Sequence, residues 1–258
     1  MEESLRMMTF NLWNYNPPWD LRRKLIAETI RSHNPDVVAL QESRHDFRHN
    51  GGRGQGEQIA ELTGYHPTSA VAQVYIPVLR VDEGLTILTR DQPAEYDVCR
   101  LTQHPRGRED ENRRICLAVT IEHAGRRVHI FDTHFSLSAA ARLDNALEVQ
   151  RFVRERAGDE PGVLMGDLNA EPDEDSMLFL TGAHRIGGEV GGFVDCWTAA
   201  NPGDPGYTYA SFDPVRRIDY ILGWKLPEVR ISALVDPGND EQGIFPSDHS
   251  SVVATLSL

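Results

Sequence analysis

Gly166-Asp167-Leu168-Asn169 follows directly on an apolar run, Val163 to Met165, and places a carboxylate and an amide two residues apart. Because side chains alternate along a strand, we expect Asp167 and Asn169 to share one face at the mouth of a buried strand. A carboxylate there can take a proton and an amide can donate hydrogen bonds to developing charge, which suits work on a phosphoryl group. The alternative for an isolated segment of this kind is an ordinary Asx turn.

The segment does not stand alone. Other strand-like runs end in acid, amide or imidazole side chains: Thr9-Phe10-Asn11-Leu12, Leu40-Gln41-Glu42, Asp132-Thr133-His134-Phe135, Arg217-Ile218-Asp219-Tyr220 and Ser247-Asp248-His249. Six such motifs at strand ends make an active site the leading hypothesis.

Length and composition bound the class of protein. The 258 residues, 40% of them hydrophobic, suffice for one large domain with a substantial core, and we expect a single domain over residues 1–258. No apolar stretch approaches a membrane span, and the charged amino terminus does not resemble a signal peptide. The three widely spaced cysteines, Cys99, Cys116 and Cys196, favour free thiols in a reducing compartment, so we expect a cytoplasmic protein.

The chain is strongly acidic. Its 26 Lys and Arg residues against 39 Asp and Glu residues give a net charge of −13. This balance disfavours tight nonspecific binding to long nucleic acid, because it offers no global attraction for a polyanion. Part of the negative charge can serve a hard divalent cation, which prefers clustered oxygen ligands, while most of it would form a solvated surface.

Strands and helices must position these motifs. Periodicity predicts strands at 5–12, 37–40, 85–88, 115–122, 127–131, 163–166, 193–196, 218–222, 229–234 and 251–256. Helices are predicted at 20–32, 57–62, 138–156 and near 173–180, the first capped by Asp20 with Leu21 in its apolar stripe. The strands joined by His123-Ala124-Gly125 indicate a hairpin. This mixture excludes a strict βαβ repeat and favours an α/β or α+β fold of mixed sheets with helices outside.

Read in order, the six motifs resemble those of the endonuclease/exonuclease/phosphatase family over residues 7 to 252. The resemblance implies a four-layered αββα sandwich, in which two mixed β-sheets lie face to face between helices, with the site at one edge. It also implies a divalent-metal-dependent phosphoesterase, with Mg²⁺ as the expected metal and Mn²⁺ or Ca²⁺ as alternatives.

The resemblance assigns catalytic roles to several motif residues. Asp167 would be the general base for an attacking water, and Asn169 would hydrogen-bond the transition state. Outside these motifs, the pair Arg113-Arg114 starts a strand, where a guanidinium such as that of Arg114 can bind a substrate phosphate, with a solvated strand edge as the alternative.

Two imidazoles would lie beside the scissile phosphate. A donor imidazole there can neutralise a phosphoryl oxygen, and a neighbouring carboxylate keeps it in the right tautomer and charge. The resemblance pairs His249 with Asp219, and Glu83 is the supporting carboxylate expected beside His134.

The resemblance also names a set of metal ligands. Glu42 is expected to be the main ligand, since a carboxylate at the end of a buried strand is held rigidly, and Asp248 would add a second oxygen. Asn11 would orient Glu42 or contact the metal or the phosphate through its amide. The alternatives are a surface acid for Glu42, a turn-forming residue for Asn11 and, for Asp248, a residue that braces the loop bearing His249.

Two differences separate the chain from abasic-site endonucleases. Trp13 stands where those enzymes have an acidic residue, and His134 stands where they have a tyrosine. Both point to the branch with deoxyribonuclease-like, lipid-phosphodiesterase and sugar- or nucleotide-phosphodiesterase members. The net charge favours a small or lipid-derived phosphodiester. A nuclease acting on DNA or RNA is the second hypothesis, and a non-catalytic scaffold that binds a phosphorylated ligand is the third.

Overall fold

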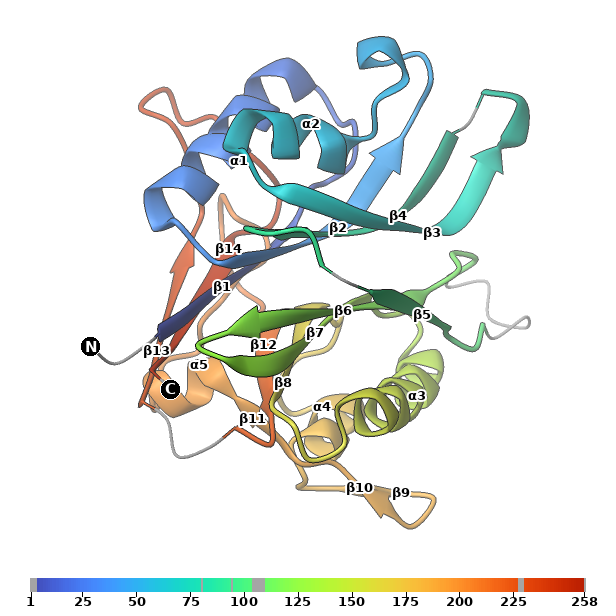
Figure 1. Ribbon diagram of the computed structural model, residues 1–258, viewed down its shortest axis with the longest axis vertical. Helices are drawn as coiled ribbons and strands as arrows, with labels where there is room; N and C mark the ends of the chain where they lie inside the picture. Colours follow the sequence, from blue (N-terminus) through green and yellow to red (C-terminus); the bar gives the residue numbers. More distant parts are fainter. Residues whose placement is uncertain (1–3, 80, 94, 104–109, 227–229, 258) are drawn as a thin grey trace.

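Two six-stranded sheets lie face to face with helices on their outer sides (Figure 1). The computed structural model describes residues 4–79, 81–93, 95–103, 110–226 and 230–257. Helices α1 and α2 cover one sheet, and α3 and α4 cover the other (Figure 1).

The first sheet has the strand order β13-β14-β1-β2-β4-β3. Strands β1 and β2 are parallel and are joined by α1, whereas the other described pairs are antiparallel. The elements of this half are β1 Ser4–Asn11, α1 Trp19–His33, β2 Val37–His45, the 3₁₀ turn Asn50–Gly52, α2 Gln55–Thr63, β3 His66–Ile76, the 3₁₀ turn Pro77–Leu79, β4 Val81–Thr89, β13 Arg230–Asp236 and β14 Ser251–Ser257.

The second sheet has the order β11-β12-β8-β7-β6-β5 and the same kind of parallel centre. Strands β7 and β8 are parallel and are joined by α3, and the remaining pairs are antiparallel. Its elements are β5 Tyr96–Arg100, β6 Ile115–His123, β7 Arg126–His134, α3 Ala139–Ala157, β8 Gly162–Asp167, α4 Asp175–Leu180, β11 Phe193–Asp195, α5 Cys196–Ala200 and β12 Asp219–Trp224; β9 Arg185–Ile186 and β10 Glu189–Val190 form a separate pair.

Side-chain alternation along the central strands produces the layers. In β1, Met7 packs into the core between the sheets and Met8 into the core beneath α1. In β8, Val163 likewise faces the other sheet, whereas Leu164 faces the helical side. The predicted αββα sandwich is therefore confirmed.

Several predicted elements match closely. The hairpin is formed by β6 and β7, whose two connecting residues, Ala124 and Gly125, both have positive φ (55° and 71°), as a type I′ turn requires. Helix α2 ends at Gly64, which has a φ of 83°. The predicted strand at 229–234 corresponds to β13, although Val229 itself lies outside the described residues.

The prediction for the first helix was wrong in two details. The helix begins at Trp19, so Asp20 lies in the first turn and pairs with Arg23 at 3.0 Å instead of capping. Leu21 is 36% exposed, whereas Arg22 is 1% exposed and occupies the buried face. Strands β3 and β5 were not predicted; both lie at sheet edges, where partial exposure blurs the apolar alternation.

Strand β2 does not end at Glu42 as predicted. It continues to His45, and its pairing with β4 shifts between Leu40 and Ser43. Glu42 has a φ of 52°, the left-handed conformation of a β-bulge. Regular alternation would point Glu42 to the helical side with Leu40, so the bulge is what turns its carboxylate toward the other sheet.

No helix within the described ranges is long and apolar enough to cross a membrane.

Gly166 is required by the close approach of β8 to β7. Its φ is 146°, and a Cβ there would lie 1.9 Å from the Thr133 carbonyl oxygen. We expect Gly166→Ala to lower the free energy of unfolding by about 3 kcal/mol or more, because strain and overlap add. Gly64→Ala, where φ is 83° but nothing lies within 4 Å, should cost about 1–2 kcal/mol. Urea unfolding of both variants checks this, and equal losses would contradict it.

Candidate active site

Topology brings the six motifs to one edge of the sandwich. Asn11, His134 and Asp167 stand at the carboxyl ends of β1, β7 and β8. Asp219 begins the antiparallel strand β12 directly opposite Asp167. His249 immediately precedes β14, whose start lies beside the end of β1. The motifs that contain Asp219 and His249 were predicted to follow strands, but they lie at or just before the first residue of β12 and of β14.

The polar groups continue the faces that form the core between the sheets. On β8, Val163 and Met165 belong to that core, and Asp167 is the next residue on the same face. On β12, Ile221 belongs to it and Asp219 precedes it on the same face. The apolar layer between the sheets thus ends in a polar layer, and its carboxylates are held on rigid strands.

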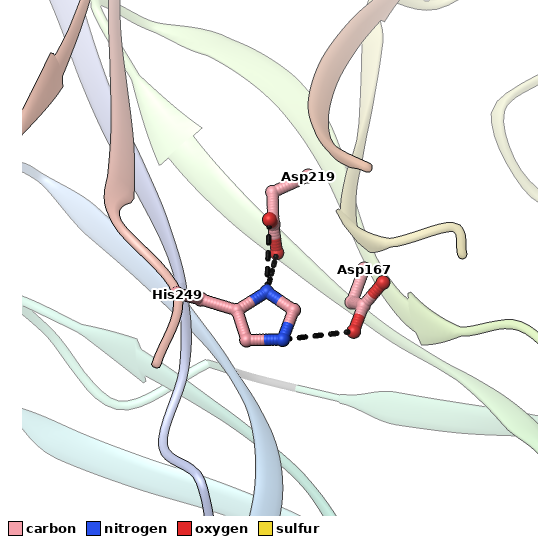
Figure 2. A group of neighbouring side chains, drawn as sticks. All are labelled: Asp167, Asp219 and His249. Carbon is pink, nitrogen blue, oxygen red and sulfur yellow. Dashed lines mark hydrogen bonds and ion pairs between the residues drawn. The ribbon is translucent and has the colours of Figure 1, made fainter. Parts of the chain in front are cut away.

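His249 lies between two aspartates (Figure 2). Its Nδ1 lies 2.9 Å and 3.1 Å from the two oxygens of Asp219, and its Nε2 lies 3.8 Å from Oδ2 of Asp167. The Thr208 hydroxyl donates to the Asp219 carboxylate at 2.6 Å and so fixes its orientation. The expected contact between His249 and Asp219 is present.

The electrostatics of this dyad favour an imidazolium. Burial acts to lower the pKa of His249, but the charges of Asp219 and Asp167 outweigh it and raise the pKa to about 10. Burial raises the pKa of Asp167, and the nearby Asp219 adds to this effect. The site therefore pairs a charged imidazole with a carboxylate that is more basic than usual.

Asp167 lies at the centre of the contacts. Its Oδ2 accepts from Nδ2 of Asn11 at 3.0 Å and lies 3.3 Å from Nε2 of His134. Its Oδ1 accepts the backbone N–H of Asn169 at 3.0 Å, which is the hydrogen bond of an Asx turn. The two interpretations of this segment are therefore not exclusive, because the turn itself holds the carboxylate.

His134 and Asn169 are also brought together. Nδ2 of Asn169 lies 3.0 Å from Nε2 of His134 and donates to the Phe135 carbonyl at 3.0 Å. Burial lowers the pKa of His134 well below its usual value, and the nearby Arg114 and His249 charges lower it further. His134 is thus a neutral imidazole, in contrast to His249.

Glu42 is held by two amides. Its Oε1 accepts from Nδ2 of Asn11 at 3.4 Å and its Oε2 from Nδ2 of Asn14 at 3.1 Å. The side-chain oxygen of Asn11 accepts the backbone N–H of Trp13 at 2.9 Å. Asn11 therefore faces Glu42 and Asp167 through its nitrogen, as a residue that orients both carboxylates.

Two groups of acidic side chains can be considered for a metal. Asp167, Asp219 and His249 offer ligand atoms within 4.8 Å of one another. The charges of Asp219 and Asp167 keep the His249 ring protonated, so a metal ion on its Nε2 would have to displace a proton from an imidazolium, which disfavours metal binding at this group. Glu42 and Asp248 form no ion pair with a cationic side chain in the described chain, and their oxygen donors fit a hard divalent cation.

The expected pairing of Glu83 with His134 is not seen between these two described residues. Glu83 instead accepts from Arg44 at 2.7 Å, and Arg44 stacks on the Tyr75 ring at 4.9 Å. Arg44 comes just after the bulge in β2 and lies opposite Glu83 on β4. It therefore binds the Glu83 carboxylate that was predicted to pair with His134.

Arg114 lies in the site and is held by a partner that sequence reasoning missed. Its Nη2 lies 3.0 Å from Oδ2 of Asp110, which also accepts the backbone N–H of Leu137. Thr208 and Asn14 were missed as well. Their signal is weak, because a threonine or an asparagine in a loop usually faces solvent.

These side chains line one cavity of about 350 Å³. It contains Glu42, Asp248, both imidazoles, Asp167 and Asn169, and its wall includes Arg44, Tyr75, Asn112, Arg114, Leu137, Tyr209 and Arg216. Every residue predicted for the site except Asn11 and Asp219 therefore lines the cavity. Asn11 and Asp219 lie behind the groups that they orient.

Comparisons with known proteins agree with this geometry. The Endonuclease/Exonuclease/phosphatase family matches residues 8–249. Nocturnin of Drosophila melanogaster is 26% identical to this chain in an alignment 290 residues long. The alignment covers 93% of this chain and 42% of Nocturnin. The chain thus spans less than half the length of that relative.

Solved structures share the fold. An endonuclease/exonuclease/phosphatase from Bacteroides vulgatus aligns with a TM-score of 0.78 and 22% identity over 99% of both chains. The human Nocturnin catalytic domain, solved with a bound sulfate anion, aligns with a TM-score of 0.76 and 20% identity over 99% of this chain and 93% of that chain. The chain belongs to the endonuclease/exonuclease/phosphatase family, a family of divalent-metal-dependent phosphoester hydrolases.

A buried polar contact between the sheets supports the site from below. Nε2 of Gln41 donates to Oδ1 of Asp132 at 2.7 Å and to the Thr9 hydroxyl at 3.0 Å. Oδ2 of Asp132 has no hydrogen-bond partner among the described residues. Burial raises the pKa of Asp132 well above its usual value, against the opposing bond from Gln41.

Asp132 should therefore make stability depend on pH. Above about pH 4, Asp132 is ionised in the unfolded chain and neutral in the folded chain. The free energy of unfolding therefore falls by about 1.4 kcal/mol per pH unit until the pH reaches the pKa of the folded state. We expect the free energy of unfolding of Asp132→Asn, relative to the parent, to be higher at pH 7 than at pH 5. Urea unfolding at both pH values tests this, with the exposed Asp213→Asn as a control that should show no such change. A difference independent of pH would contradict it.

Proposed function

We propose that this chain is a divalent-metal-dependent phosphodiesterase. The observation that carries the proposal is the cavity in which a His249–Asp219 dyad faces the buried Asp167 carboxylate. Beside the dyad lie Glu42 and Asp248, which form no ion pair with a cationic side chain among the described residues. This combination supplies a proton acceptor, a fixed positive charge and a place for a hard cation.

The residues would divide the reaction among them. Asp167 takes a proton from the attacking water, whose oxygen forms a bond to phosphorus as the bond to the leaving oxygen breaks. The His249 imidazolium, kept charged by Asp219, and the Asn169 amide stabilise the negative charge that develops on the phosphoryl oxygens. Neutral His134 donates a hydrogen bond from its one N–H to a phosphoryl oxygen.

The metal site is proposed on Glu42 and Asp248. A divalent cation bound there would act as a Lewis acid on a phosphoryl oxygen, with Mg²⁺ expected and Mn²⁺ or Ca²⁺ as alternatives. Asn11 holds Glu42 and Asp167 in a fixed relation through one amide nitrogen.

A small or lipid-derived phosphodiester is the substrate class that the cavity favours. Each arginine in its wall already has a carboxylate partner: Arg44 with Glu83, Arg114 with Asp110 and Arg216 with Glu171. Their positive charge is therefore largely balanced, and the net charge of −13 opposes a long polyanion. Arg114, which is buried beside His134, is the residue proposed to contact the substrate phosphate.

A cytoplasmic location is part of the proposal. The three cysteines are free thiols, and Cys116 and Cys196 are buried. Burial raises the pKa of the Cys116 thiol well above its usual value, so the thiolate is suppressed. Unreactive thiols without disulfides support a reducing compartment.

The function is tested by hydrolysis of bis-(p-nitrophenyl) phosphate and p-nitrophenyl phosphate with EDTA, Mg²⁺, Mn²⁺ or Ca²⁺. We expect turnover of the diester that EDTA abolishes and added metal restores. Glu42→Gln should need a higher metal concentration for half-maximal rate, whereas Glu61→Gln, which changes an exposed carboxylate paired with Arg53, should behave as the parent does. Undiminished turnover in EDTA would contradict the metal dependence.

The dyad makes a separate prediction. His249→Asn should lower kcat for the diester roughly 100- to 10,000-fold, because the fixed positive charge is lost. His184→Asn is the matched control, since His184 is an exposed residue paired with Asp175, and it should retain the parental rate. A fully active His249→Asn would remove this mechanism.

A nuclease is the second candidate, supported by the family name alone. Strong cleavage of plasmid DNA by the same preparations, falling steeply with salt, would favour it. Metal binding without turnover of any phosphoester would instead favour a non-catalytic scaffold.

A further inference from the structure

Arg22 is a buried cation that the proposed mechanism does not use. Its side chain is 1% exposed on α1, and its guanidinium lies 5.0 Å and 5.5 Å from the ring centres of Trp13 and Trp19. Burying a charge is costly unless it is hydrogen-bonded, so the partners of Arg22 indicate which part of the structure its side chain stabilises.

All five N–H donors of Arg22 are directed to backbone carbonyl groups. Its acceptors are the carbonyls of Leu12, Asn14 (3.2 and 3.4 Å), Asn16 (2.9 Å) and Pro246 (3.0 Å). Three of the four lie in the segment that follows β1, and the fourth lies just before the Ser247-Asp248-His249 motif. One side chain therefore ties together two loops from opposite ends of the chain.

Both loops carry groups of the proposed metal site. The Asn14 side chain donates to Oε2 of Glu42 at 3.1 Å, and Pro246 is two residues before Asp248. The Asn14 carbonyl also accepts from Gln55 at 2.8 Å, and the side-chain oxygen of Gln55 accepts the backbone N–H of Arg44 at 3.0 Å. The backbone of Asn14 is thus held by Arg22 and Gln55, while its side chain holds Glu42.

We propose that Arg22 is a positioning residue for the metal site, acting through Asn14 on Glu42 and through the Pro246 carbonyl on Asp248. This rests on the proposed function, which places the metal on those two carboxylates. The bulge at Glu42 makes such support necessary, because its left-handed backbone is not fixed by regular strand pairing.

The charge of Arg22 matters as well as its shape. None of its five hydrogen bonds goes to a carboxylate, so it faces Glu42 and Asp248 without occupying their oxygens. Burial lowers the pKa of Arg22 to about 10, whereas the charges of Asp248 and Glu42 act to raise it, so the guanidinium remains charged at neutral pH. Lysine would keep the charge but could not make the same fork of bonds.

The test measures Mn²⁺ binding to the full chain by calorimetry, without substrate. Arg22→Lys and Asn14→Ala should each weaken Mn²⁺ binding roughly 10- to 100-fold, the usual effect of removing support from a metal ligand. The double variant should lose less than the product of the two factors, because both changes act on Glu42. Ile30→Ala, a buried apolar change on the same helix, controls for loss of stability and should bind Mn²⁺ as the parent does at temperatures where both are folded.

The outcomes separate this inference from the proposed function. Parental Mn²⁺ affinity in a folded Arg22→Lys variant, or fully multiplicative losses in the double variant, would overturn the positioning role. If Arg22→Lys does not fold, parental affinity in Asn14→Ala, which changes a partly exposed residue, overturns it equally. A parent protein that binds Mn²⁺ with the predicted variant pattern but hydrolyses no phosphoester would overturn the function and leave the positioning role supported.

Discussion

The hydrogen bond from Asn11 to Asp167, 3.0 Å long, joins the two sheets at the edge where the site forms. The sheets otherwise meet through an apolar layer, whose contacts are non-directional and tolerate sliding. A buried polar contact has no such tolerance, because an unmade hydrogen bond in the interior is costly. Together with the contact between Gln41 and Asp132, it fixes the position of one sheet relative to the other, and every distance across the cavity depends on that position.

The four layers were predicted from the resemblance to the family. Alternation within a strand predicts instead where a polar group lies, because one face of a central strand is apolar along most of its length and polar at its end. On β8 the face reads Val163, Met165, Asp167, so a regular strand carries its catalytic candidate to the cavity without further information. The same reasoning fails at Glu42. Alternation assigns its carboxylate to the helical side, and a bulge that no residue type announces turns it to the cavity. The resemblance to a family, not periodicity, identified that residue.

The sequence also did not predict which residues distant along the chain would contact one another, for a related reason. Whether Glu83 meets His134 or Arg44 depends on which side chain reaches it across two strands, and Arg44 reaches it because it follows the bulge. Arg22 is a similar case. Helical periodicity alone cannot distinguish an arginine that faces solvent from one whose five donors find carbonyls in two loops, since those loops are brought to α1 only by the finished fold.

The distribution of charge in the cavity explains how an acidic protein can suit an anionic substrate. The arginines of the wall form ion pairs with carboxylates of their own, as in the pair Arg114–Asp110. Glu42 and Asp248 form no ion pair in the described part of the chain, and the charges of His249 and Arg22 act on them only at a longer distance. The two carboxylates, and not the arginines of the wall, therefore lack a counter-charge in direct contact. A divalent cation bound there would supply that charge and would at the same time present a positive centre to a phosphate. On the proposed mechanism the attraction for substrate would come mainly from a bound ion in one cavity and not from a basic surface, which would favour a compact phosphoester over a long polyanion.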